Sequence, residues 1–195
     1  MKARLHRGLV TLGRHVGADN RASQVAEFAV SLPLLVVFVV GIFDFGGAFT
    51  LKQKLTNAAR EGARAAAAGP ASDVGNSSAV APASVSDAFQ VVDNYLLGEN
   101  INDCGLKGST GLGPKLTWTY QAVASGPPLC DLKLTIDRGC ITPQDTSQGT
   151  VDVVDTCVTI EYAYNWRFNN VIGLVGRTLT LPNKLTTTAV AFNEN

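Results

Sequence analysis

The longest apolar segment of the chain lies near its N-terminus, between Phe28 and Phe43. No charged residue interrupts it, and Asp44 is the only charge between Phe28 and Leu51. Twenty residues of helix cover about 30 Å, the thickness of the hydrocarbon core of a bilayer. The pattern therefore predicts one membrane-spanning helix, with a local kink at Pro33.

Beyond the span, the polarity pattern predicts that the same helix continues with only one apolar face. Small or apolar residues recur there at helical spacing: Leu51, Leu55, Ala58, Gly62, Ala65 and Ala66. Small side chains let a second helix approach closely, although alanines also favour a helix by propensity alone. We expect this helix to begin near Ser23, a good N-cap residue, and to end at Gly69-Pro70.

The part of the chain after residue 83 predicts a small α+β head. Ser84 or Ser86 is expected to cap a second helix that closes at Gly98. Its apolar face contains Val85, Phe89, Val92 and Leu96. Segments rich in Thr, Val, Ile and Tyr then predict four antiparallel strands, at residues 115–123, 132–136, 153–166 and 178–192. The expected organisation is a basic leader (1–22), a transmembrane and amphipathic helix (23–69), a linker (70–83) and the head (84–195).

Charge is distributed unevenly along a chain whose formal net charge is zero. The leader before Glu27 contains five basic residues and one acid, Asp19. The part after Gly69 contains seven basic and twelve acidic residues. An acidic head is a poor candidate for binding nucleic acid, which needs a basic surface. The basic leader favours a cytoplasmic N-terminus, although bases also follow the span.

All four cysteines, Cys104, Cys130, Cys140 and Cys157, lie in the head. An even number without Cys-x-x-Cys spacing favours disulfides in an oxidising compartment over a zinc site. Four buried free thiols are the alternative. If bridges form, neighbours in the sequence are the first pairs to expect, Cys104 with Cys130 and Cys140 with Cys157.

The head offers little for catalysis. The only two histidines, His6 and His15, lie in the leader, so the head has no imidazole for nucleophilic catalysis. Carboxylates could act in pairs or bind calcium, namely Asp152 with Asp155 or Asp131 with Asp137. We interpret them instead as solvated charges on strands and loops. No enzymatic activity and no cofactor are expected.

The start and the continuation of the long helix resemble the TadE-like pilus-assembly family, the pseudopilins of tight-adherence (Flp) type IVb pili. The resemblance rests on Ala26-Glu27-Phe28-Ala29, on Pro33 within the span, and on Asn57-Ala58-Ala59-Arg60-Glu61-Gly62-Ala63-Arg64. The C-terminal TTTAVAFNEN also looks like the terminal strand of the family.

This resemblance implies a pilin-like fold and a role in assembly. A prepilin peptidase would cut between Ala22 and Ser23, where prepilins more often have glycine before the cut. Glu27 would become the fifth residue and could meet the freed amine of a neighbouring subunit, since a carboxylate at the edge of hydrocarbon needs a partner. Its alternative role is to complement the helix dipole. Asp44 is expected near the outer interface of the membrane.

The resemblance also implies partners and a location. The protein would be a minor pseudopilin in the bacterial inner membrane, with its N-terminus cytoplasmic and its head periplasmic, and it could enter a surface pilus. Its partners would be the bilayer, other pilins and pseudopilins, the tight-adherence secretion machinery and the peptidase. Two alternatives remain: a secreted binding protein whose signal peptide is cut near Gly46-Gly47-Ala48, and a single-pass anchored binding protein unrelated to pili.

Overall fold

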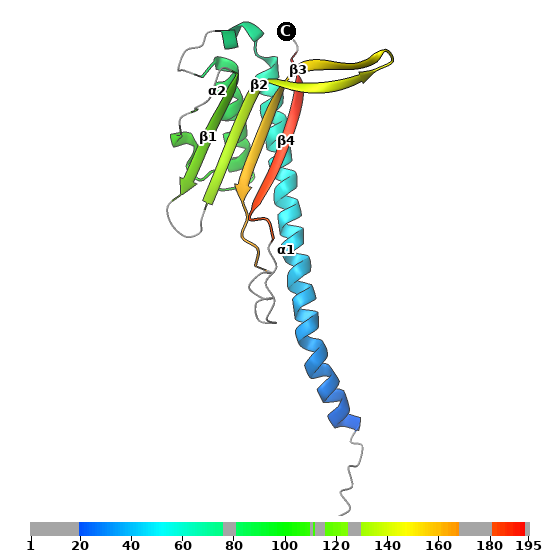
Figure 1. Cartoon of the computed structure of the whole chain (residues 1–195). Coiled ribbons are helices and arrows are strands. Elements are labelled where there is room, and N and C mark those ends of the chain that lie inside the picture. The colour runs from blue at the N-terminus through cyan, green and yellow to red at the C-terminus, as the bar shows by residue number, and fades with distance from the viewer. Residues whose placement is uncertain are drawn as a thin grey trace, which may run out of the picture. The chain divides into compact units, whose positions relative to one another are not determined.

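A computed structural model of the chain describes residues 20–75, 81–109, 111, 116–124, 130–167 and 181–193. The chain divides into two compact units, Met1–Val39 and Val40–Asn195. Its elements in order are α1 (Asn20–Ala68), the 3-10 helix η1 (Ala71–Gly75), α2 (Ala83–Gly98), the 3-10 helix η2 (Leu106–Gly108), β1 (Thr117–Ala124), β2 (Cys130–Thr146), β3 (Gly149–Ala163) and β4 (Lys184–Phe192) (Figure 1). The predicted α+β class, with a long N-terminal helix and a helix-plus-sheet head, is confirmed.

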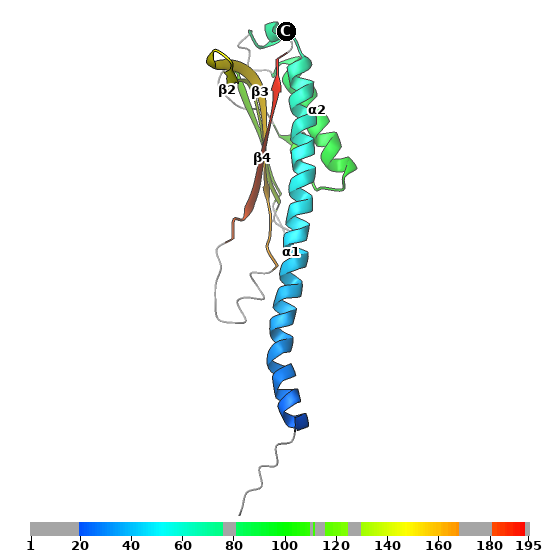
Figure 2. The same cartoon turned by 90° about the vertical axis from the view of Figure 1, so that its right-hand side faces the viewer.

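The four strands form one antiparallel sheet in the order β1-β2-β3-β4. Helix α2 and the C-terminal part of α1 lie on the same face of this sheet (Figure 2). Alternate residues of β2 point into the layer between, where Leu132, Leu134 and Ile136 are fully buried. They join Leu55 of α1 and Val92 of α2 in one core. The head is thus a two-layer structure to which α1 contributes its C-terminal turns.

Both predicted helices form, with two corrections at their starts. Helix α1 begins at Asn20 rather than at Ser23, because Arg21 and Ala22 are good helix formers that do not interrupt it. It continues through Pro33 and ends at Ala68, before the expected Gly69-Pro70 stop. The part of the expected leader before residue 20 lies outside the described residues.

The N-cap of α2 is Pro82, and neither Ser84 nor Ser86 has that position. The backbone N–H of Ser84 donates instead to the Asp73 carboxylate, over 2.9 Å. Asp73 lies on η1, inside the expected linker of residues 70–83. The Asp73 side chain, eleven residues upstream of Ser84, therefore accepts the helix-start hydrogen bond that an N-cap side chain usually accepts.

The strands are located correctly, but several of their bounds differ from the prediction. The expected 132–136 strand is the middle of a longer β2, and the expected 153–166 strand ends earlier, at Ala163. The last strand begins at Lys184, and residues 178–180 of its expected start lie outside the described residues. Leu181 to Asn183 are not in a strand, since the Pro182 nitrogen cannot donate a sheet hydrogen bond.

The largest difference is a two-stranded ribbon that the sequence did not predict. Strand β1 pairs with β2 only as far as Asp137, and β4 pairs with β3 only from Asp155 onward. The residues between Cys140 and Asp155 therefore pair only across β2 and β3 among the described strands, and Asp155 at the base also pairs with Phe192 of β4. Figure 1 shows this ribbon projecting sideways beyond β4.

Two disulfides fix parts of the head. The bonds join Cys104 to Cys130 and Cys140 to Cys157, the pairs suggested by their order in the chain. The first connects the loop after α2 to the start of β2, and the second closes the base of the ribbon. Loops of this length correspond to about 3 kcal/mol of stabilisation each in the chain-entropy model. No cysteine is left free.

Candidate functional site

The apolar half of α1 exposes nearly all of its side chains. The following large apolar residues are exposed there: Val25, Phe28, Val30, Leu32, Leu34, Leu35, Val36, Phe38, Val39, Ile42 and Phe43. In the described part of the chain, α1 is the one helix long and apolar enough to cross a membrane. Burying so much apolar surface requires lipid or other apolar helices. The segment therefore fits a single-pass membrane anchor.

The candidate residues at the start of α1 are exposed on the helix. Ser23, Glu27, Phe28 and Pro33 are all accessible. Ser23 and Glu27 are four residues apart, so they share one helix face. The bond between Ala22 and Ser23 lies in the first turn of α1, where backbone N–H groups have no intrahelical acceptor and unwinding is least costly.

Asp44 of α1 accepts hydrogen bonds from the segment that follows β3. Asp44 is only 7% exposed. The Tyr164 hydroxyl donates to its backbone carbonyl over 3.0 Å and to its carboxylate over 3.1 Å. Burial raises the pKa of the Tyr164 phenol, and the Asp44 carboxylate raises it further, so Tyr164 stays a neutral donor. The single acid within this apolar region is thus held by the head.

Aromatic side chains surround the same point. The rings of Phe45 and Trp166 lie 5.1 Å apart, and those of Tyr164 and Trp166 lie 4.8 Å apart. The indole N–H of Trp166 donates to the Pro182 carbonyl over 2.6 Å. Tyr and Trp with one polar and one apolar end are typical of membrane–water interfaces. This cluster lies immediately after the exposed apolar segment.

The Asn57 to Arg64 run divides by exposure. Its small residues Ala58, Ala59, Gly62 and Ala63 are buried, whereas Asn57, Arg60, Glu61 and Arg64 are exposed. A Cβ added at Gly62 would lie 2.5 Å from the Val92 Cγ2 atom of α2. The interpretation that small residues allow a close helix is therefore supported, and the close helix is α2 of the same chain. Only the polar members of the run remain available to partners.

A buried charge pair holds the far end of α1. Arg138 of β2 donates to the carbonyl of Gly69 over 3.0 Å, which satisfies a group at the helix C-terminus. Its guanidinium also lies 3.9 Å from the Asp73 carboxylate. Burial lowers the pKa of Arg138, and the Asp73 charge opposes that effect. Since Asp73 also caps α2, the pair links α1, η1, α2 and β2.

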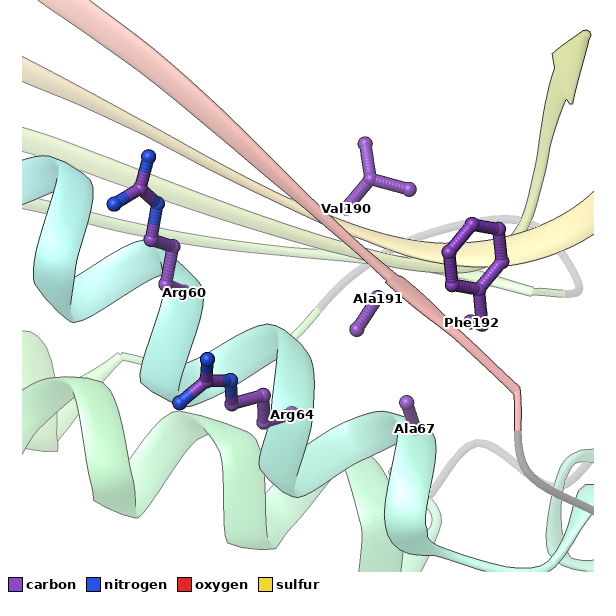
Figure 3. Close-up of a pocket in the computed structure, with 6 residues that line it drawn as sticks. All are labelled: Arg60, Arg64, Ala67, Val190, Ala191 and Phe192. Atoms are coloured by element: carbon purple, nitrogen blue, oxygen red, sulfur yellow. The ribbon is translucent and has the colours of Figure 1, made fainter. Parts of the chain in front are cut away.

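The exposed arginines of the run line one side of a groove. We call it the arginine groove and define it by its six lining residues, Arg60, Arg64, Ala67, Val190, Ala191 and Phe192 (Figure 3). The first three come from α1 and the others from the end of β4. Among the described residues Arg60 has no ion pair, and Arg64 has one, 3.5 Å from Glu61. The groove joins a basic end to an apolar end.

The candidate carboxylate pairs do not form. Asp155 is fully buried and accepts a hydrogen bond from the Thr142 hydroxyl, whereas Asp152 is exposed. Residues three apart on a strand point to opposite faces. Asp131 pairs with Lys184 over 2.8 Å, and six residues of strand separate it from Asp137 by about 20 Å.

Sequence reasoning missed the arginine groove and the Arg138–Asp73 pair. The residues of the groove were visible as the polar part of the Asn57 to Arg64 run and as the terminal strand, but nothing in the sequence says that they meet. Arg138 stands in a strand-like region as an ordinary charged residue. Its isolation between apolar strand positions was the only available signal.

Comparisons with known proteins give one finding. Residues 22–64 match a family model described as TadE-like protein, which confirms the resemblance identified in the sequence. The matched segment runs from Ala22 to Arg64 and includes Glu27, Pro33 and the Asn57 to Arg64 run. The match supports involvement of the chain in Tad pilus assembly. No match was found among curated proteins or among solved structures.

Proposed function

We propose, from the TadE-like match of residues 22–64, that this chain is a minor pseudopilin of a tight-adherence (Flp) type pilus. The observation that carries the proposal is the matched helix itself. Its first half exposes a continuous apolar surface, and its second half forms part of a folded head. Such a helix can leave the bilayer and pack beside other pilin helices while the head stays folded. Major pilins of this type are expected to be far shorter than this chain, which supports its assignment as a minor component.

The proposed location is the bacterial inner membrane, with the N-terminus cytoplasmic and the head periplasmic. Five basic residues before Glu27 favour a cytoplasmic leader. The two disulfides favour an oxidising compartment for the head. The aromatic cluster of Tyr164 and Trp166 with Phe45 supports an outer interface near Asp44.

Glu27 is proposed to act in assembly after a prepilin peptidase cuts between Ala22 and Ser23. The cut would leave an ammonium group on Ser23, four residues from Glu27 on the same helix face. In an apolar environment a carboxylate needs a partner, and the amine of a neighbouring subunit supplies one. The proposed partners are accordingly other pilins, the secretion machinery and the peptidase. The TadE-like family supports a structural role, and this function needs no catalytic step or cofactor.

The structure counts against the secreted alternative. Its signal peptide would be cut near Gly46-Gly47-Ala48, inside α1. There Ala48 is buried, and a Cβ at Gly47 would lie 3.2 Å from the Tyr164 hydroxyl. N-terminal sequencing of the membrane-bound protein separates the two proposals. A first residue of Ser23 is expected here, whereas the alternative requires a soluble chain that begins near residue 49.

The assembly role is tested by Glu27→Ala. The variant is expected to remain in the membrane fraction, because it removes a charge from an apolar helix, and to abolish piliation. Asp87→Ala is the control, since Asp87 is an exposed acid on α2, outside the matched segment. Electron microscopy counts the pili, and fractionation measures insertion. Normally piliated Glu27→Ala cells would contradict the role of Glu27.

A further inference from the structure

Between Cys140 and Asp155 the ribbon has no third strand paired beside it among the described residues. Its base is closed by the Cys140–Cys157 disulfide, next to a register shift between Asp137 and Cys140. Six steps along each strand give it a reach of about 20 Å. A two-stranded ribbon alone is marginally stable in water, so a projecting ribbon of this length is better explained by a contact surface.

One face of the ribbon is fully exposed and has two chemically different parts. Near the base, Ile141 pairs with Val154 across the strands, and they are 65% and 54% exposed. Toward the tip, Asp152 and Asp145 lie on the same face by strand alternation, and both are exposed. The ribbon contains no basic residue. Its face is therefore apolar at the base and acidic toward the tip.

The arginine groove has the complementary composition. Ala67, Val190 and Phe192 form its apolar end, and Phe192 is 60% exposed. Arg60 and Arg64 form its basic end, and Figure 3 shows both side chains projecting from α1. None of these six lining residues comes from the ribbon of the same chain.

We propose that the ribbon of one copy docks in the arginine groove of a second copy of this chain. Ile141 and Val154 cover Phe192 and Val190, and Asp152 and Asp145 face the two arginines. This inference rests on the proposed assembly function and adds a contact between heads to the contact between helices.

A second copy is the favoured occupant for two reasons. First, one chain carries both complementary surfaces: the acidic part of the ribbon matches the basic end of the arginine groove, and the apolar part of the ribbon matches its apolar end. The two surfaces also lie at the same end of the head, since Ala67 is next to the end of α1 and Asp155 at the ribbon base pairs with Phe192. Copies with parallel α1 helices therefore meet without a large axial shift. Because the two surfaces differ, the contact is heterologous.

The test uses two full-length copies with different tags, expressed together in the membrane. One carries a photo-crosslinking residue at Val154. Irradiation is expected to give a dimer whose cross-link maps by mass spectrometry to residues 60–67 or 190–192 of the other copy. The double variant R60E/R64E in the second copy should lower the dimer yield by about tenfold. Adding D145K/D152K to the first copy should restore it.

The controls are Lys52→Glu on α1 and Asp87→Lys on α2, both exposed residues outside the two surfaces. Neither should change the yield. Non-reducing gels verify that both disulfides form in every variant. The proposal would be overturned by cross-links that form only to another protein or only to other parts of this chain. It would also be overturned if the charge reversals leave the dimer yield unchanged. If pilus formation depends on Glu27 but this cross-link is not found, only the proposed contact between heads is refuted. If the cross-link forms but the cells make pili without Glu27, only the proposed assembly role of Glu27 is refuted.

Discussion

Individual carboxyl groups meet very different surroundings in this fold. Glu27 is exposed at the start of an apolar helix, and Asp73 accepts a backbone N–H and pairs with Arg138. Asp93 of α2 is buried beside a second acid, Asp103. It is 2% exposed, and one of its oxygens has no hydrogen-bond partner among the described residues. A buried carboxylate that has an unsatisfied oxygen and a like charge beside it lowers stability.

Replacement of Asp93 by Asn is therefore expected to stabilise the head at neutral pH. Burial raises the pKa of the Asp93 carboxyl, Asp103 raises it further, and Lys107 lowers it. A carboxyl whose pKa is raised on folding binds its proton more tightly in the folded state. The cost of its charge is thus fully present above the folded-state pKa and disappears as the pH falls toward its ordinary value of 3.8.

The measurement is thermal unfolding of the full-length protein in detergent, followed by the fluorescence of Trp118 and Trp166. Asp93→Asn should melt at a higher temperature than the wild type at pH 7, and the difference should vanish near pH 4. Asp87→Asn, at an exposed position of the same helix, should show no such trend. A constant difference at all pH values would contradict the role given to the Asp93 charge.

At the scale of elements, the close packing of α1 against α2 depends on Gly62. A Cβ there would lie 2.5 Å from Val92 Cγ2 and 3.5 Å from the Ala88 carbonyl. Alanine raises helix propensity by about 1 kcal/mol over glycine, but overpacking in a core costs about 1–3 kcal/mol. Gly62→Ala should therefore lower the free energy of unfolding of the head despite its better propensity.

Denaturant unfolding of the full-length protein in detergent measures this effect. Gly46→Ala is the control on the same helix, because a Cβ there meets nothing within 4 Å, and it should be neutral or stabilising. Val92→Ala in the Gly62→Ala background removes the opposing methyl group and should recover part of the loss. Equal behaviour of the Gly62 and Gly46 variants would rule out the close contact.

Elements set by local pattern were predictable, and elements set by distant partners were not. The end of α1 follows from Gly69-Pro70, and the sheet segments follow from their Thr, Val and Ile content. The cap of α2 was assigned to Ser84 or Ser86, because the sequence does not show that Asp73 lies beside the helix start. The ribbon escaped prediction because Pro143 and its polar neighbours weaken the strand pattern. Proline is tolerated there because none of the described strands pairs with the ribbon at Pro143 other than β3.

The candidate site was predictable to a similar degree. The helix pattern indicated an anchor with Glu27 near its start, and the Asn57 to Arg64 run indicated close packing. Which helix packs there, and which members of the run stay exposed, depend on how the head folds back on α1. That information lies in the core formed by Leu55, Val92 and the sheet, and no single segment contains it.

At the scale of the whole molecule, the proposed insertion assigns each part of α1 to a different environment. The exposed apolar residues between Val25 and Phe43 require hydrocarbon or apolar helices. Asp44 accepts hydrogen bonds from Tyr164 of the head. The N-terminal turn, with Ser23 and Glu27, should then lie at the cytoplasmic face, and the part of α1 after Asp44 should lie outside.

Single cysteines placed along α1 test this assignment in the native protein, because its own four cysteines are all in disulfides. We expect Thr50→Cys to react with a membrane-impermeant maleimide once the outer membrane is permeabilised. Leu35→Cys should stay unlabelled, because hydrocarbon excludes both the reagent and the reactive thiolate. Gln24→Cys should react only after the inner membrane is opened. Labelling of Gln24→Cys before that step, together with protection of Thr50→Cys, would mean that the chain has the opposite orientation, and reaction of Leu35→Cys in intact membranes would exclude the span.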